Sequence, residues 1–409
     1  MAWQTQSNGY IAFKVQSALG SIASGGSGFV LRTAGGAGGV LTKQPYGSNE
    51  VRSDGMMTRG RHGGRKTSGV YSVEVSLDNM DAIYEAVFRG TYVTALVITE
   101  ATSGGPTEIT TTASEIVGNS GSWITVGLRV GDVIRLTNHA TAGNNSRNLR
   151  ITGLTASTIT VAETLTLNAV ADTAFTITRP GQKLINPAAG SLVKRYFTID
   201  EYDADIDYVE TFQDVVFQSL RFSMQPNGMI MCDIAWTGVG RLATSSGGSA
   251  PTLTSPTEST GSPLACVDST VRFGSTDFVD LTSWDLMIDI GGVAPDVIAS
   301  VYAPDVFTGQ MKVGMNLTML RSDYTMLSGF DAETPFSLHA LMVENESEPK
   351  DFLALFVPNF TIGGVQKSPL SKEAGPRTQA ITIPPELVGK DVTGGAYDAT
   401  MVKLLTSNT

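Results

Sequence analysis

The stretch GVYSVEVSLDNMDAIYEAVF, residues 69–88, changes its periodicity halfway along. Apolar residues first recur at every second position, which is typical of a strand with one buried face, and then at helical spacing. The two sets are Tyr71, Val73, Val75 and Leu77, followed by Met80, Ile83, Tyr84 and Val87. With Asp78 as a helix cap, the stretch predicts a strand that runs into a short packed helix.

A second stretch, GQMKVGMNLTMLRSDYTMLSGF at residues 309–330, follows the same plan. If Gly309 is aligned with Gly69, the alternating apolar residues of the second strand are Met311, Val313, Met315 and Leu317. The helix residues that follow are Leu320, Tyr324 and Leu327. Each copy then continues into a predicted strand, at 93–98 and at 336–343. We infer that a strand, helix, strand unit was duplicated within the chain.

The composition indicates a mainly β protein. Only 16% of the 409 residues are charged, against roughly 25% in ordinary soluble domains, while glycine, serine and threonine are abundant. A formal net charge of -11 argues against a protein whose main role is to coat nucleic acid. The length predicts two or three domains.

Three zones of the sequence differ in composition and in predicted secondary structure. Residues 96–184 are threonine-rich, with short β-type runs between turns, and predict a small inserted all-β domain of barrel or Ig-like type. Residues 220–236 predict a hairpin with its turn at 225–228. Residues 241–263 are too polar to pack and predict a linker. The domains are therefore placed at 1–95 with 185–245, at 96–184 and at 246–409.

A basic cluster stands out in this acidic chain at residues 59–66. It consists of Arg59, Arg61, His62, Arg65 and Lys66, interleaved with glycines. Such a run either grips nucleic acid or contacts an acidic protein surface.

Three segments, in this order, resemble the tail tube (major tail) proteins of long flexible-tailed, siphovirus-type bacteriophages. They are GSNEVRSDGMMTRGRHGGRKTSGVYSVEVSLDNMDAIYEAVFRG (47–90), RYFTIDEYDADIDYVETFQDVVFQSLRFSMQPNGM (195–229) and VYAPDVFTGQMKVGMNLT (301–318). The resemblance implies two tube-type β-sandwich domains, each with a flanking helix. Their inner sheets would join those of neighbours into a barrel around a channel through which DNA is ejected. It implies no enzyme and no cofactor.

The resemblance also implies how the chain assembles. A duplicated chain would form a pseudo-hexameric ring from three copies, with six copies as the alternative, and the rings would stack helically into the tail of the virion. The implied partners are further copies of the chain, the tape-measure, tail terminator and tail-tip proteins, and phage DNA that passes without specific binding. No membrane is involved, and assembly is expected in the bacterial cytoplasm, with the inserted domain outside the tube.

Two sets of residues are candidates for this role. The lumen-facing candidates are Ser72, Glu74, Ser76, Gln310, Lys312 and Asn316, which equally suit the solvated face of an ordinary sheet. In the family the segment corresponding to 40–68 reaches the adjoining ring. Its basic cluster is expected to contact an acidic surface on a neighbour, with Asp203, Asp205 and Asp207 as candidates. The second copy has VIASVYAPDVFTG (297–309) in place of this arm.

Other motifs give weaker signals. The three aspartates resemble a calcium loop, but Tyr208 occupies the glycine position and the closing glutamate is absent. The glycine-rich stretch 24–39 lacks the Lys-Ser/Thr of a phosphate loop and predicts flexibility. The three histidines have no ligand spacing, and no nucleophile motif is visible, so neither a metal nor a catalytic residue is predicted. Cys232 and Cys266 predict reduced, mostly buried thiols.

Two other functions remain open at this point. A carbohydrate-binding or adhesive virion protein would use the inserted domain, although Trp123 and Phe175 are its only aromatic residues. A nucleic-acid-binding protein would use the cluster at 59–66. No secretory signal and no run near the ~20 apolar residues of a membrane span is visible, so folding in a cytoplasm is expected.

Overall fold

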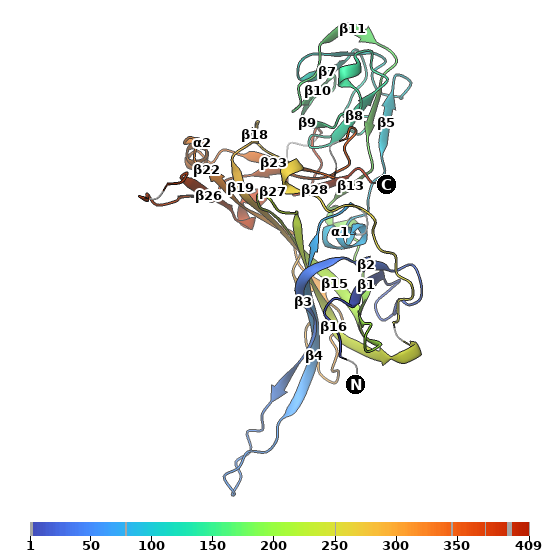
Figure 1. The fold of residues 1–409 in the computed structure, drawn as a ribbon, viewed down its shortest axis with the longest axis vertical. Coiled ribbons are helices and arrows are strands. Elements are labelled where there is room, and N and C mark those ends of the chain that lie inside the picture. Colours follow the sequence, from blue (N-terminus) through green and yellow to red (C-terminus); the bar gives the residue numbers. More distant parts are fainter. Residues whose placement is uncertain are drawn as a thin grey trace.

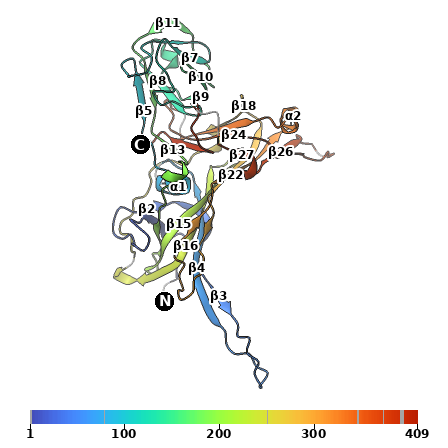
Figure 2. The same ribbon diagram turned by 180° about the vertical axis from the view of Figure 1, so that it is seen from behind.

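The computed structural model describes residues 3–77, 80–249, 251–344, 347–372, 374–390 and 395–408. It is mainly β, as predicted: 47% of the residues lie in strands. Figures 1 and 2 show three tiers, with a separate β unit at one end, a flat sheet in the middle and a long sheet that ends in an arm.

The first sheet forms the long tier and the arm. Within the described ranges it contains eleven strands: β1 (Gly9–Val15), β2 (Phe29–Leu31), β3 (Thr33–Tyr46), β4 (Arg61–Glu74), β14 (Phe197–Asp203), β15 (Tyr208–Met224), β16 (Met231–Ser246), β19 (Leu281–Asp289), β22 (Lys312–Leu320), β25 (Gly364–Lys367) and β26 (Thr378–Ile383). All of its pairings are antiparallel.

The second sheet forms the separate unit. Its strands, among the residues described, are β5 (Leu96–Thr99), β6 (Ile109–Thr111), β7 (Glu115–Gly118), β8 (Val133–Thr137), β9 (Leu149–Leu154), β10 (Thr158–Val161), β11 (Asn168–Asp172) and β12 (Thr176–Arg179). Residues 123–130 of this zone form no strand and include a series of turns. The apolar residues among them, Trp123, Leu128 and Val130, still fill the core of this unit.

The third sheet is the middle tier. In the described part of the chain it contains β13 (Gln182–Ile185), β17 (Thr270–Phe273), β18 (Thr276–Phe278), β23 (Phe336–Val343), β24 (Phe352–Phe360), β27 (Val388–Gly389) and β28 (Lys403–Thr406). Alternate residues of β24 serve two cores. Leu353 and Leu355 join the core shared with the first sheet, whereas Phe352 and Ala354 pack with Val133 of the second.

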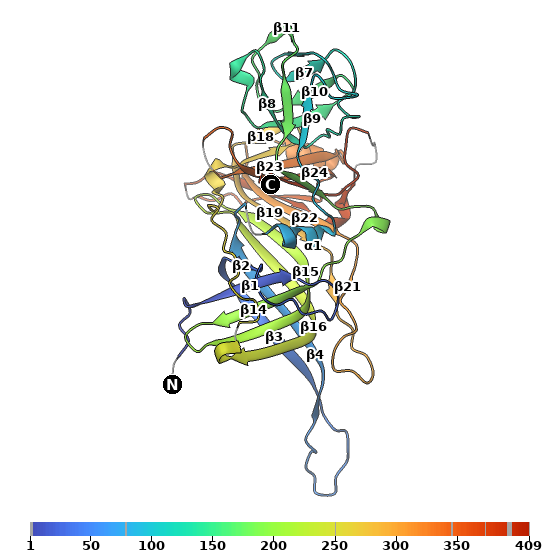
Figure 3. The same ribbon diagram turned by 90° about the vertical axis from the view of Figure 1, so that its right-hand side faces the viewer.

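The strand and helix expected at 69–88 are confirmed. The two apolar sets from Tyr71 to Val87 are all buried, and helix α1 covers Asp81–Phe88. The predicted cap, Asp78, lies outside the described residues. Figure 3 shows α1 lying across the first sheet beside β15.

The second copy agrees only in its strand. Met311, Val313, Met315 and Leu317 are buried along β22. Helix α2 (Thr325–Asp331), however, begins four residues later than the pairing of Gly69 with Gly309 implies. Leu320 therefore belongs to the strand, and the predicted helix face is wrong. Tyr324 is 73% exposed, and the helix buries Met326 and Gly329 instead. The strands that follow the helices, β5 and β23, lie in different sheets.

Each of the two stretches expected to be flexible is packed in part. Gly39 of β3 lies so close to the ring of Phe212 that a Cβ atom there would overlap it, so glycine here permits close packing. In the predicted linker, β16 continues to Ser246. Leu253 is buried, and its backbone N–H donates to Asp200 Oδ2 over 2.7 Å. The hairpin expected at 220–236 is confirmed by β15 and β16.

Candidate functional site: the open face of the first sheet

One face of the first sheet is buried and the other is open. The buried set, alternating along six adjacent strands, is Tyr71, Val73, Cys232, Ile234, Leu220, Phe222, Leu286, Ile288, Val313, Met315, Leu317 and Ile381. The residues between them point away from the core. The open face therefore spans β4, β16, β15, β19, β22 and β26 without interruption.

The register brings side chains that are distant in sequence into rows across this face. Ser72 lies opposite Asp233, and Asp233 lies opposite Arg221. Arg221 in turn lies opposite Met287, and Met287 opposite Gly314. A groove of about 660 Å³ follows these rows, lined by residues from all six strands.

Charged groups on the open face are mostly acidic. Among the described residues along the groove and its rows they are Glu74, Asp233, Asp285 and Asp289, against Arg221 and Lys312, and Lys66 lies farther along the same face of β4. Two of the carboxylates are held by neighbours. Arg221 Nε donates to Asp285 Oδ1 over 2.8 Å, and Ser72 Oγ donates to Asp233 Oδ1 over 2.5 Å. The face thus carries an excess of carboxylates held in place by neighbours, beside the exposed apolar side chains of Val70 and Met287.

The structure places four of the six lumen candidates on this face: Ser72, Glu74, Lys312 and Asn316. Gln310 is exposed but precedes β22. Ser76 is buried, at 4% exposure, and so does not belong to the open face. The strand ends at Glu74, and the chain then turns inward, where Val75 N donates to Ile230 O.

Strands β15, β16 and β19 contribute residues to the open face that were not among the candidates. They include Ser219, Arg221, Asp233, Asp285 and Asp289. The alternation of Leu220 and Phe222 with polar residues carried the same period-two signal. Their position beside β4 and β22 follows only from strand pairing, which the sequence pattern does not specify.

The arm is an ordered hairpin that extends β3 and β4, and the loop 47–60 forms its tip (Figure 3). Only part of the basic cluster is free to meet a neighbour. Arg65 N donates to Val301 O over 2.8 Å, and its guanidinium lies 5.5 Å from the ring centre of Tyr302. Lys66 Nζ lies 3.4 Å from Asp296 Oδ2.

These contacts show that the segment 297–309, which replaces the arm in the second copy, packs along the arm's base. The outer members of the cluster, Arg59, Arg61 and His62, are exposed.

The three aspartates at 203–207 lie at the hairpin between β14 and β15. The Asp205 carboxylate accepts hydrogen bonds from Thr5 N and Asn8 Nδ2, and the bonds from Thr5 are the main cause of its lowered pKa. Asp207 Oδ1 accepts a 2.9 Å hydrogen bond from the Tyr202 hydroxyl. Within one chain these groups therefore hold the N-terminal segment and the turn, and none contacts the basic cluster.

The rival sites gain no support from the geometry. Trp123 and Phe175 are fully buried and offer no platform to a sugar. No group of three His, Cys, Asp or Glu side chains in the described part of the chain is placed to hold a metal ion. Both cysteines are free thiols, with Cys232 buried and Cys266 half-buried. Among the described helices, none is long and apolar enough to cross a membrane.

The fold and this face define a class of protein before any comparison is made. A mainly β chain with an open face across six strands and a projecting hairpin arm presents extended surfaces to which further chains can pair. A family model described as phage tail tube protein matches residues 6–384, so the chain belongs to that family. No curated protein matches the chain at a significant level.

Membership gives the chain a structural role. It is a component of the phage tail that self-assembles, with other tail proteins, into a tube.

Proposed function

We propose that three copies of this chain close into a ring whose channel is lined by the open face of the first sheet, and that DNA is ejected through that channel. The rings would stack into the tail tube of a siphovirus-type phage. The units at 1–95 with 185–245 and at 246–409 would each supply half of a chain's share of the wall, and the unit at 96–184 would lie outside.

The order of strands in the sheet carries this proposal. Reading across the sheet gives β3, β4, β16 and β15, followed without a gap by β19, β22, β26 and β25. Within each set of four, the strands met in this spatial order are the first, second, fourth and third of the set along the sequence. Helix α1 follows the second strand of the first set, and α2 follows the second strand of the second set. Two like units thus lie side by side in one sheet.

The junction between these units indicates how copies would join. Within the chain, the last strand of the first unit, β15, pairs with the first strand of the second unit, β19, from Ser219↔Asp289 to Met224↔Trp284. The equivalent strands at the two ends are β25 and β3, and within the described part of the chain each is paired on one side only. An unpaired edge strand is a template for pairing with another chain. Antiparallel pairing of β25 with β3 of the next copy would repeat the internal junction and remove both edges.

The polarity of the open face suits passage of DNA. A wall with a negative balance repels phosphates weakly, and one of the two cations in its groove, Arg221, is paired with Asp285. Direct imaging tests the function: purified protein should form hollow tubes in electron micrographs, with an isolated ring having the mass of three 43.2 kDa chains. Protein that stays monomeric when concentrated would contradict the proposal. Rings of six chains would contradict the trimer.

A further inference from the structure

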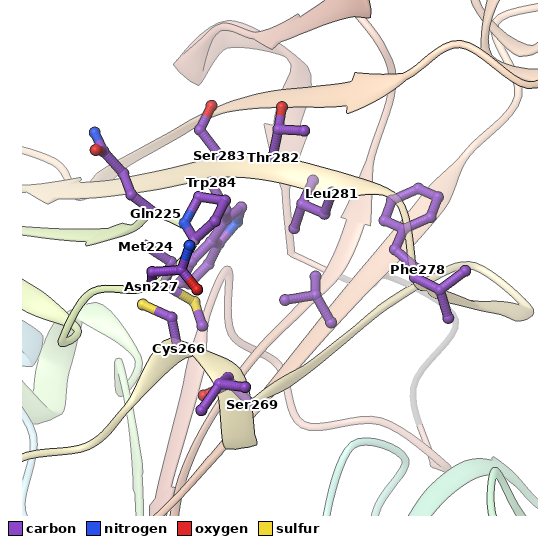
Figure 4. A pocket seen from close by; sticks show the side chains of 14 residues that line it. Met224, Gln225, Asn227, Cys266, Ser269, Phe278, Leu281, Thr282, Ser283 and Trp284 are labelled. Carbon is purple, nitrogen blue, oxygen red and sulfur yellow. The ribbon is translucent and has the colours of Figure 1, made fainter. Parts of the chain in front are cut away.

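A second hollow, distinct from the open face, lies beneath the turn between β15 and β16. It encloses about 330 Å³. Figure 4 shows its labelled side chains coming from the turn, from the short 3-10 helix η4 (Cys266–Asp268), and from β18 and β19. Backbone hydrogen bonds fix these segments: Cys266 N donates to Gly228 O over 3.0 Å, and Ile230 N to Leu264 O over 2.9 Å. The pocket is thus preformed.

The residues that line this pocket have the properties of a surface that a partner covers. Val267 and Val279, at its mouth, are 81% and 99% exposed. Trp284, which also lines the pocket, is buried, yet its indole N–H has no hydrogen-bond acceptor among the described residues. Exposed aliphatic groups beside an unsatisfied buried donor mark a surface that a partner completes.

The tip of the arm has the complementary chemistry. Val51, Met56 and Met57 are largely exposed, and methionine adapts to irregular apolar surfaces. Arg59 and Arg61 make no ion pair with any described residue. At the pocket, Asp268 and Asp280 directly follow the two exposed valines and are likewise without an ion pair within the described ranges. The exposed apolar groups therefore match, and Arg59 in the tip and Arg61 beside it are complementary to the two aspartates, whereas Arg52 and Asp54 of the tip pair with each other.

We propose that the tip of the arm, residues 47–60, occupies the pocket beneath the β15–β16 turn of a second copy in the adjoining ring. This inference rests on the proposed function. The tip of the arm cannot reach the pocket of its own chain, because tip and pocket lie at opposite ends of the same strands. An arm that occupies the pocket therefore belongs to another copy. Strand β4 runs from Arg61, next to the tip, to Glu74, which pairs with Met231 beside the turn. These thirteen steps of roughly 3.3 Å separate the two ends by about 43 Å.

The arrangement also explains stacking. A contact between one end of a molecule and the opposite end of the next is heterologous and repeats without closing. Each described chain offers one such arm and one such pocket, so every ring can receive the arms of one neighbour and extend its own to the other. The loop, with about seven residues on each side, can extend roughly 20 Å past the last paired residues, Tyr46 and Arg61.

Cross-linking to the native thiol of Cys266 tests the contact. Met57→Cys tubes, treated with a short bismaleimide, should give a ladder of cross-linked chains. The ladder should vanish when Cys266→Ser is added. Met57 is exposed, so the substitution leaves the core intact. Val170→Cys, at an exposed valine of the second sheet, is the matched control and should give no ladder.

The other outcomes overturn the proposal in distinguishable ways. Tubes that form normally but give no ladder, or give the same ladder from Val170→Cys, would exclude this pocket while leaving the tube intact. A ladder from Trp3→Cys instead would show that the N-terminal segment is the occupant. If the unaltered protein forms no tubes, the proposed function fails together with the contact.

A charge exchange gives an independent readout. Arg59→Glu with Arg61→Glu should leave folded chains that form rings but do not stack. Adding Asp268→Arg with Asp280→Arg should restore tubes. Stacking that survives the first pair of substitutions, or is not restored by the second, would contradict the proposed contact.

Discussion

Lys403 Nζ lies 2.9 Å from Asp132 Oδ1, although 271 residues separate them in the sequence and both side chains are almost fully buried. Asp132 belongs to the unit of the second sheet and Lys403 to the last strand of the third. Lys403 also lies 2.8 Å from Asp398, which accepts hydrogen bonds from Lys183. This buried network joins the unit of the second sheet to the rest of the protein.

Replacing Lys403 by Met should therefore loosen that joint. Removing one partner of a buried ion pair leaves the other charge unpaired and typically costs about 3–5 kcal/mol. We expect a lower free energy of unfolding and faster proteolysis within 96–184. Lys312→Met removes an exposed lysine and should change the free energy of unfolding by less than about 0.5 kcal/mol. Equal effects from the two variants would contradict a role for the network.

The network also predicts a pH dependence. Burial alone would raise the pKa of the Asp398 carboxyl, but the ammonium groups of Lys403 and Lys183 outweigh it and lower the pKa from 3.8 to about 2. A carboxyl with a lowered pKa in the folded state stabilises the protein above its unfolded pKa, and this contribution is lost as the pH falls towards 2.

Asp398→Asn should consequently destabilise the protein at pH 7, by on the order of 2 kcal/mol. The difference from the unaltered protein should shrink between pH 4 and pH 2. Denaturant unfolding at a series of pH values measures it. A difference that stays constant over this range would show that the carboxyl is not held in its charged form.

Gly39 gives a test of the packing beneath the arm. A Cβ atom there would overlap the ring of Phe212, so Gly39→Ala should destabilise the protein by about 1–3 kcal/mol. Gly47→Ala is the matched control, because nothing lies within 4 Å of the added carbon. Thermal unfolding of the two variants compares them. If both unfold like the unaltered protein, the close approach of β3 to Phe212 is wrong.

The open face can be tested through the passage of DNA. Ser72→Lys with Glu74→Lys should leave folding and tube formation unchanged, because both side chains lie outside the core. The added cations should attract phosphates and slow DNA release from phage that carry the variant tail. Val170→Lys, at an exposed position of the second sheet, is the control. If phage with the double variant release DNA as fast as unaltered phage and as the control, this face is not the channel wall.

Local patterns in the sequence predicted the elements better than their positions. The alternation at Tyr71 and at Val313 predicted two strands and their buried faces, because period two follows directly from strand geometry. The four-residue shift of α2 was not visible, since an even shift preserves that alternation. Ser76 continued the pattern of Ser72 and Glu74, but the strand had already ended.

Contacts between segments that are distant in the chain could not be predicted from the sequence. Arg65 and Lys66 resembled a free cationic arm because nothing near them in the chain reveals Tyr302 or Asp296. Gly39 resembled part of a flexible loop because the ring that it packs against, Phe212, lies far along the chain. Pairing of β15 with β19, which joins the two halves into one sheet, likewise depends on the fold as a whole.

Covalent closure of the junction between copies tests directly whether β25 of one copy pairs with β3 of the next in a ring of three. Ala34 in β3 and Gln366 in β25 are both exposed. In a Cys266→Ser background, Ala34→Cys with Gln366→Cys should form disulfides between copies after mild oxidation. We expect one denaturant-resistant product with the mass of three 43.2 kDa chains, which reduction returns to monomers. A product of six chains, or only uncross-linked monomers from intact tubes, would contradict it.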